Sequence, residues 1–266
     1  MSERRIVVVG VGSIGSRHID TLLAAGECDL VGVDLNPSPN DERLPIVTNF
    51  EDLGPWRPTH ALICSPPALH YEHAIYFLKQ GIPTFIEKPM TQYSCEAEAL
   101  NVCAKESGAY IGVGYMERAH HVVASAKEFF DKFGCRVAVI TCYWRSTQKT
   151  YMQNVVAESS HAIDLAGYLL GPICTVKRES FGDEVVVYTY HYSGAVCSIF
   201  MNMNKDPLRS IFMRFDNEHV FEVAYGNTRD EWDKCYSAEL EAFLSGAPLC
   251  TGEDGAQVVE VLEEVK

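Results

Sequence analysis

Four short motifs in this chain carry residue types that could bind a ligand or move a proton. The first is a glycine fingerprint in which Gly10, Gly12 and Gly15 follow an apolar, β-branched run that ends at Val9. Glycine at these places allows a tight turn, close approach of the backbone to a pyrophosphate, and close packing of a helix on a strand. We therefore expect a dinucleotide site formed by the turn residues Gly10, Gly12, Ser13, Ile14 and Gly15.

An acidic residue, Asp34, ends the next apolar run, nineteen residues after Gly15. A carboxylate at this place accepts hydrogen bonds from the adenosine ribose hydroxyls and repels a 2′-phosphate. The residues after it, Leu35-Asn36-Pro37, offer no arginine. The sequence thus favours NAD(H); NADP(H) stays possible if Arg43 folds back into the pocket, and a purely structural glycine turn is the alternative.

The second motif, Ser65-Pro66-Pro67-Ala68-Leu69-His70, follows another apolar run and begins a helix. In an open α/β sheet, ligands lie outside the carboxyl ends of the strands, so we expect Ser65, Pro66 and His70 to lie near the cofactor. His70 and His73 are three residues apart, but no carboxylate or cysteine pattern completes a metal site around them. We expect no metal.

The third motif, Glu87-Lys88-Pro89, stands at the end of a further expected strand. A lysine beside a bound nicotinamide can polarise a substrate hydroxyl or carbonyl, while Glu87 can hold the nicotinamide ribose. The alternative is a solvated salt-bridge pair.

The fourth motif is a polar stripe of Glu158, His161 and Asp164, which spacings of three place on one face of a helix. Histidine can take or return a proton near neutral pH, and a carboxylate one turn away can orient it. The alternative is an exposed, capped helix start at Ser159 and Ser160.

The elements that must position these motifs follow two different patterns. Up to residue 118, strands and helices alternate with short connections, which predicts a doubly wound parallel sheet. The expected strands are 4–9, 29–34, 60–64, 83–86 and 110–114, with helices at 13–25, 67–80 and 93–107. We therefore expect an NAD(P)-binding Rossmann domain at 1–118.

After residue 118, hairpin-short connections predict a mainly antiparallel sheet. The expected strands are 136–144, 184–192, 195–203, 209–215 and 219–225, with helices at 120–132, 158–170, 231–244 and from 255. We expect an α+β domain at 119–266 for substrate binding and oligomerisation, whose last helices can pack back on the Rossmann domain.

Composition excludes several classes of protein. The 266 residues are 47% hydrophobic and 22% charged, as in globular proteins, and 22 basic against 36 acidic residues give a net charge of −14. Such a charge argues against nucleic acid and anionic membranes as partners. The ten cysteines form no CxxC pattern, and we find neither a signal peptide nor a membrane span, so we expect a cytoplasmic protein.

Together these motifs resemble the Gfo/Idh/MocA family of NAD(P)-dependent oxidoreductases, which includes glucose–fructose oxidoreductase and inositol dehydrogenase. The resemblance extends over nearly the whole chain. It also rests on Val113-Gly114-Tyr115-x-x-Arg118 and on Glu239-x-x-x-Phe243-Leu244 followed by Thr251-Gly252-Glu253-Asp254-Gly255. Glu87-Lys88-Pro89, at its distance from the glycine fingerprint, is the most specific of these motifs.

The resemblance implies a Rossmann domain, an open-faced sheet domain and an active site at the nicotinamide end between them. A hydride would pass between nicotinamide and a secondary alcohol or ketone of a sugar, a polyol or a nucleotide-linked sugar, while Lys88 and His161 manage the hydroxyl proton. Oligomerisation through the sheet implies a homodimer or homotetramer. The residues implied in substrate binding are Lys88, Tyr115, Arg118, Glu158, His161 and Asp164.

Two positions depart from the family pattern. Many relatives carry Asp four residues before the histidine, where this chain has Ala157 next to Glu158, and the asparagine common after the Gly-Tyr pair is Met116 here. The chain is also short for the family. A catalytically silent NAD(H)-binding sensor or regulatory subunit therefore stays open, as does a bile-pigment or imine reductase on the same fold.

Overall fold

The computed structural model describes residues 4–26, 28–36, 42–145, 160–182, 184–202, 204–215, 218–225 and 228–265. The chain divides into two compact units. Unit 1 consists of Met1–Tyr115 and Tyr236–Ala256, and unit 2 consists of Met116–Cys235 and Gln257–Lys266. The domain limits at residue 118 stay a prediction.

Unit 1 contains the alternating strands and helices expected from the sequence. They are β1 (Arg4–Val9), α1 (Ser13–Ala25), β2 (Cys28–Val33), β3 (Ile46–Val47), β4 (His60–Ile63), α2 (His70–Leu78), β5 (Thr84–Ile86), α3 (Ser94–Ser107) and β6 (Ile111–Val113). The two-residue strand β3 was not predicted. A 3-10 turn, Pro67–Leu69, takes the place of the first turn of the helix expected at 67–80.

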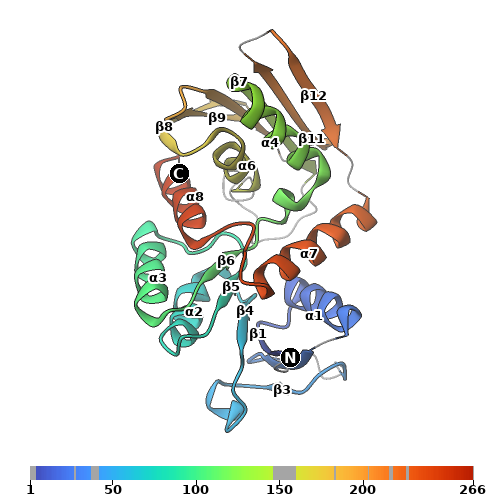
Figure 1. Cartoon of the computed structure of the whole chain (residues 1–266), viewed down its shortest axis with the longest axis vertical. Coiled ribbons are helices and arrows are strands. Elements are labelled where there is room, and N and C mark those ends of the chain that lie inside the picture. Colours follow the sequence, from blue (N-terminus) through green and yellow to red (C-terminus); the bar gives the residue numbers. More distant parts are fainter. Residues whose placement is uncertain are drawn as a thin grey trace. The chain divides into compact units, whose positions relative to one another are not determined.

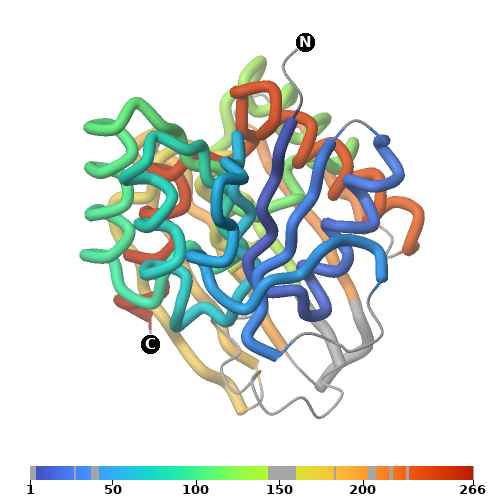
Figure 2. Tube along the Cα trace, turned by 90° about the horizontal axis from the view of Figure 1, so that it is seen from below, coloured from blue at the N-terminus to red at the C-terminus, as the bar shows by residue number. Residues whose placement is uncertain are grey.

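The six strands of unit 1 form one parallel sheet in the order β3-β2-β1-β4-β5-β6. In Figure 2 the dark-blue β1 lies in the middle of this sheet. The direction in which successive strands are added reverses beside β1, so the carboxyl ends of β1 and β4 form the switch point where ligands of such sheets bind. The expected doubly wound fold is confirmed.

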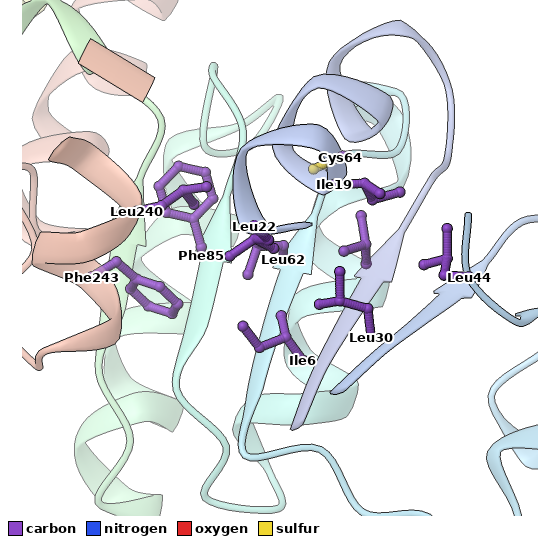
Figure 3. Packing of buried hydrophobic residues seen from close by; sticks show 11 residues of the cluster. Ile6, Ile19, Leu22, Leu30, Leu44, Leu62, Cys64, Phe85, Leu240 and Phe243 are labelled. Carbon is purple, nitrogen blue, oxygen red and sulfur yellow. The ribbon is translucent and has the colours of Figure 1, made fainter. Parts of the chain in front are cut away.

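The core of unit 1 follows from its β-branched strands. Ile6 and Val8 of β1 are fully buried because helices cover parallel sheets on both faces. Ile19 and Leu22 of α1 pack in the same cluster as Leu62 of β4 (Figure 3). Each fully buried aliphatic side chain of this kind contributes about 1.5–3 kcal/mol of transfer free energy.

A late segment of the chain completes this core. Phe243, from the end of α7 (Arg229–Leu244), is fully buried and lies beside Phe85 (Figure 3). The centre of its ring is 5.5 Å from that of Phe85 and 5.4 Å from that of Tyr110. The Tyr110 hydroxyl donates to the Phe243 carbonyl oxygen at 2.8 Å. The Rossmann unit is thus closed by residues that follow the whole of the second sheet in sequence.

Unit 2 is built on a second six-stranded sheet. Its elements are the 3-10 turn Met116–Ala119, α4 (His121–Phe133), β7 (Cys135–Arg145), α6 (Ser160–Leu170), β8 (Ile173–Phe181), β9 (Glu184–His191), β10 (Val196–Asn202), β11 (Asn204–Phe215) and β12 (Val220–Tyr225). Helix α7 begins in unit 2 and ends in unit 1, whereas α8 (Gly252–Glu264) begins in unit 1 and ends in unit 2.

The second sheet has the order β12-β11-β7-β10-β9-β8. Its described strands pair antiparallel except β7 and β10, which are parallel, so the expected mainly antiparallel sheet is confirmed. Strand β8 was not predicted, because its sequence, ICTVKRESF, lacks an apolar alternation. Helices α4 and α6 contact the strands of this sheet (Figure 1). No helix in the described ranges is long and apolar enough to cross a membrane.

Candidate functional site: a dinucleotide edge and a charged helix

Four segments singled out from the sequence meet at one edge of the parallel sheet. They follow β1, β4, β5 and β6, which are neighbours in that order. The first residue after each of β4, β5 and β6 donates its backbone N–H to a carbonyl oxygen at the end of the neighbouring strand. Cys64 donates to Val9 at 2.7 Å, Glu87 to Ile63 at 2.9 Å, and Gly114 to Ile86 at 2.9 Å. The glycine turn, the Ser65-Pro66 turn and the Glu87-Lys88 pair therefore share the carboxyl edge of the sheet.

The glycine turn after β1 is built so that α1 lies very close to the strand end. Gly10 has a φ of +88°, and a Cβ there would lie 2.6 Å from the Ser65 nitrogen. A Cβ on Gly15 would collide with the Gly10 carbonyl oxygen. Both positions thus require glycine for backbone reasons, as the fingerprint predicts.

Gly12 differs from the other two glycines. It is exposed, and no heavy atom among the described residues lies within 4 Å of where its Cβ would be. As the N-cap residue of α1 it has no side chain to cap the helix, so the first N–H groups of α1 lack a side-chain acceptor. Open space in front of an uncapped helix N-terminus fits the pyrophosphate of a dinucleotide.

Asp34 lies next to the glycine turn, immediately after β2. Its Oδ2 accepts the Val11 N–H at 2.8 Å, and its Oδ1 accepts the Asn36 N–H at 2.9 Å. These bonds fix the carboxylate, and each oxygen retains capacity for a ribose hydroxyl. Asp34 therefore suits NAD(H), as the sequence indicates.

Arg43, the residue that could admit NADP(H), folds back onto α1. Its Nη2 donates to Ser16 Oγ at 2.7 Å, and its Nη1 donates to Asp20 Oδ1 at 2.6 Å. The guanidinium is thus engaged by α1 side chains. Residues 37–41, which lead to it, lie outside the described part.

His70 is a buried residue that contacts the turns at the same edge of the sheet. Its side chain is buried, with Nε2 2.7 Å from the Ser65 carbonyl oxygen and Nδ1 2.9 Å from the Pro89 carbonyl oxygen. Burial lowers the pKa of His70, which favours the neutral ring with a single N–H. The His70 ring thus lies between the turns after β4 and β5, and in its neutral form it donates to one of these two carbonyl oxygens. Its cofactor contact stays a prediction.

Glu87 and Lys88 follow β5 and differ in how deeply they are buried. Glu87 is buried; its Oε1 lies 2.7 Å from His18 Nε2, and its Oε2 accepts the Lys88 N–H at 3.1 Å. Burial opposes its ionisation, but the His18 bond and the charge of Lys88 outweigh burial and lower the pKa of Glu87. Lys88 itself is half-buried. The expected contact of Glu87 with a ribose stays a prediction.

In unit 2, Arg118 and Asp164 form a buried ion pair. Arg118 Nη2 lies 2.7 Å from Asp164 Oδ1, and Arg118 Nε lies 3.1 Å from Oδ2. The guanidinium also lies 4.8 Å from the centre of the Tyr168 ring. Asp164 therefore fixes Arg118 against α6, and the expected substrate contacts of both residues stay predictions.

The remaining expected site residues are placed as follows. His161 is half-buried on α6, with buried residues on either side of it in sequence. Tyr115, at the end of unit 1, is fully buried. Glu158 lies outside the described residues, so its place on the predicted stripe is not described.

Sequence reasoning missed His18 and Glu117. His18 is fully buried on α1, and its only sequence signal is its position three residues after Gly15, on the side of Ile19 and Leu22. Glu117 is buried next to Arg118 and accepts the Tyr225 hydroxyl at 2.8 Å, with Arg209 Nε 2.9 Å from its other oxygen. Their partners lie 69 and 108 residues away, beyond the reach of any local pattern.

The parallel sheet with its switch point, the glycine turn and Asp34 define a dinucleotide-binding unit of the Rossmann type. Residues 4–115 match the Gfo/Idh/MocA family model, described as an oxidoreductase family with an NAD-binding Rossmann fold. This part of the chain is therefore similar to the NAD-binding domain of that family.

Three similar proteins show how far the likeness extends. A 4-carboxy-2-hydroxymuconate-6-semialdehyde dehydrogenase of Sphingobium is 18% identical over 240 residues, 79% of this chain and 76% of its own length. The scyllo-inositol 2-dehydrogenase (NADP(+)) IolW of Bacillus subtilis is 25% identical over 122 residues, 41% of this chain but only 34% of its own length.

The third is a crystal structure, the WlbA dehydrogenase of Bordetella pertussis in complex with NADH and UDP-GlcNAcA. It is 19% identical, with a TM-score of 0.84, over 99% of this chain and 94% of that one. At this identity the likeness shows that the two chains share a fold.

Substitutions at Gly12 and Gly15 separate cofactor binding from folding. The Gly12→Ala side chain has space and an allowed φ of −74°, so we expect the fold to persist while NADH binding weakens about 10-fold or more, because the methyl group occupies the pyrophosphate approach. Gly15→Ala should lower the thermal unfolding temperature as well. Calorimetric titration with NADH and a melting curve measure both; unchanged affinity in Gly12→Ala would refute the assigned binding edge.

The Arg118–Asp164 pair predicts a large stability difference between two aspartates of unit 2. Asp164→Ala leaves a guanidinium buried without its carboxylate and should cost about 3–5 kcal/mol in urea unfolding. Asp131→Ala removes the exposed partner of Lys127 on α4 and should cost less than about 1 kcal/mol. Equal losses in the two variants would contradict the structural role given to Asp164.

Proposed function

We propose that the protein transfers a hydride between nicotinamide and a secondary alcohol or ketone of a sugar, a polyol or a nucleotide-linked sugar. The observation that carries this proposal is Lys88, half-buried at the carboxyl end of β5 on the same edge as the dinucleotide turn. NAD(H) is the preferred cofactor, because of Asp34. The relatives named for inositol and for a UDP-sugar complex support this substrate class.

The chain's own residues would handle the proton in this reaction. Nicotinamide, when bound, supplies the hydride acceptor or donor. Oxidation of a hydroxyl also releases the O–H proton, and reduction of a ketone requires one at oxygen. We assign that proton to Lys88 and His161: an ammonium polarises the oxygen, and an imidazole takes up or returns a proton near neutral pH.

The charged residues of unit 2 would support this chemistry indirectly, by fixing the helix that carries His161. Asp164 has its carboxylate engaged by Arg118, so we assign this pair to holding α6, and with it His161, in place. Any direct substrate contact of Tyr115, Arg118, Glu158 or Asp164 would be additional.

Substitution of the two proton-handling residues tests the proposal. Lys88→Met and His161→Ala should each lower kcat/KM about 10²–10⁴-fold, the usual contribution of general acid–base catalysis, while the Kd for NADH changes little. Lys79→Met, an exposed lysine after α2, is the matched control. The assay follows NADH absorbance with inositols and UDP-sugars; tight NADH binding without turnover of any of them would favour the silent sensor instead.

We also propose that the protein is a cytoplasmic homo-oligomer that associates through the sheet of unit 2. None of its ten cysteines, all within the described residues, forms a disulfide. A row of paired residues crosses five neighbouring strands, and all of them are exposed except the half-buried Val196: Val220, Arg214, Val137, Val196 and Tyr190. Val220 is 53% exposed and Val137 44%, as expected for a face that a second copy covers.

A charge placed in this row should dissociate the oligomer. Val137→Lys removes apolar area from the centre of the row and places like charges across a symmetric contact. Sedimentation should show a dimer or tetramer for the parent and a smaller species for Val137→Lys. Val102→Lys, at an exposed valine of α3, is the control and should leave the mass unchanged. A monomeric parent protein would refute this interface.

A further inference from the structure

His18 is a buried histidine that the proposed reaction does not use. It lies on α1 with no exposed surface, and its Nε2 is 2.7 Å from Glu87 Oε1. The lowered pKa of Glu87 keeps it a carboxylate, which only accepts hydrogen bonds, so His18 Nε2 carries the proton and donates it. Its Nδ1 has no hydrogen-bond partner among the described residues. The ring therefore has one polar contact, and it is directed at Glu87.

Glu87 also contacts Lys88. Its second oxygen accepts the backbone N–H of Lys88 at 3.1 Å. Gly114 packs against the Glu87 carboxylate so closely that a Cβ at Gly114 would lie 3.0 Å from Glu87 Oε1. The carboxylate is thus held between α1 and β6, and it fixes the backbone of the residue that carries the ammonium group.

The surroundings of the His18–Glu87 pair are aromatic and contain further charges. The His18 ring makes edge contacts with Phe85 at 5.4 Å and with Tyr236 at 5.6 Å. From α7, the Glu239 carboxylate faces the cluster, and Arg17 lies over the Tyr236 ring. Burial, followed by the charge of Glu87, raises the pKa values of the Cys64 thiol and the Tyr236 hydroxyl, so both stay neutral. His70 faces Glu87 from α2.

We propose that His18 is a positioning residue for Lys88: by donating to Glu87 it fixes the carboxylate that holds the backbone N–H of Lys88. This role rests on the proposed function of Lys88. It also connects two parts of the site, since α1 begins at the glycine turn and His18 lies five residues, or about 7–8 Å, further along the same helix. The helix whose N-terminus faces the cofactor phosphates then also fixes the lysine.

Two substitutions at position 18 separate positioning from simple packing. In His18→Gln the side-chain amide nitrogen can replace Nε2 as a donor to Glu87, whereas His18→Leu fills similar space without a donor and leaves a buried carboxylate oxygen unsatisfied. We expect His18→Leu to lower kcat about 10- to 100-fold with the KM for NADH changed less than about 3-fold, because a displacement of about 1 Å costs this much in rate. His18→Gln should recover most of the loss.

A readout independent of activity is the hydrogen exchange of the Lys88 backbone amide, measured by NMR. In His18→Leu this amide should exchange about 10-fold faster or more, while the amides of Val7 and Val8 in β1 keep the parent rate. His60→Leu is the matched control: His60 is half-buried at the start of β4, at the opposite end of that strand, and its loss should not affect Lys88.

The outcomes distinguish the two proposals. Faster exchange at Lys88 and lower kcat in His18→Leu, both reversed in His18→Gln, support the positioning role. Unchanged Lys88 exchange, or exchange raised equally along β1, overturns it and leaves His18 a packing residue. If Lys88→Met retains full turnover, the proposed function fails, whereas the exchange result still shows whether His18 holds the Lys88 backbone.

Discussion

The close approach of α1 to the end of β1 is the constraint on which the ligand edge of unit 1 depends. Gly15 lies against the Gly10 carbonyl and the Cys64 side chain, at a separation that no Cβ would allow. A side chain at either glycine would move the whole helix outward. Because His18 is one turn further along α1, the same approach brings it within 2.7 Å of Glu87. Gly10 and Gly15, which the turn requires, thus also influence the geometry of the Glu87-Lys88 segment.

Unit 2 depends on a different feature: Glu117 and Arg118, consecutive residues of opposite charge in one 3-10 turn, are both buried. Glu117 is satisfied by Arg209 and the Tyr225 hydroxyl, and Arg118 by Asp164. Replacing buried ion pairs by apolar groups is often neutral for stability, but removing a single partner is costly. Such pairs therefore specify one arrangement of α6, β11 and β12 around the turn rather than adding much stability.

The sequence predicts the parts of this architecture that local patterns determine. The apolar run and the glycine fingerprint predict the bounds of β1 and the start of α1 correctly, because each signal lies within the element it defines or directly beside it. Partner choice is not local: spacing on a helix places a carboxylate one turn from His161, but no local pattern indicates that Asp164 binds Arg118, 46 residues earlier. The contact between Glu87 and His18, 69 residues earlier, likewise has no local signal, and the expected ribose contact of Glu87 stays a prediction. Strands β3 and β8 escaped detection because one is two residues long and the other is polar.

The net charge of −14 does not prevent an anionic dinucleotide from binding, because charges act over a Debye length of about 8 Å in physiological salt. What matters is the field at the helix end that faces the ligand. Helices α7 and α8 place acidic residues in their first turns, which satisfy their own N-termini. Helix α1 has none there and begins with glycine. The Asp34 carboxylate beside the turn accepts the Val11 and Asn36 N–H groups. The positive end of α1 is thereby left for a phosphate, and Asp34 for the sugar beside it.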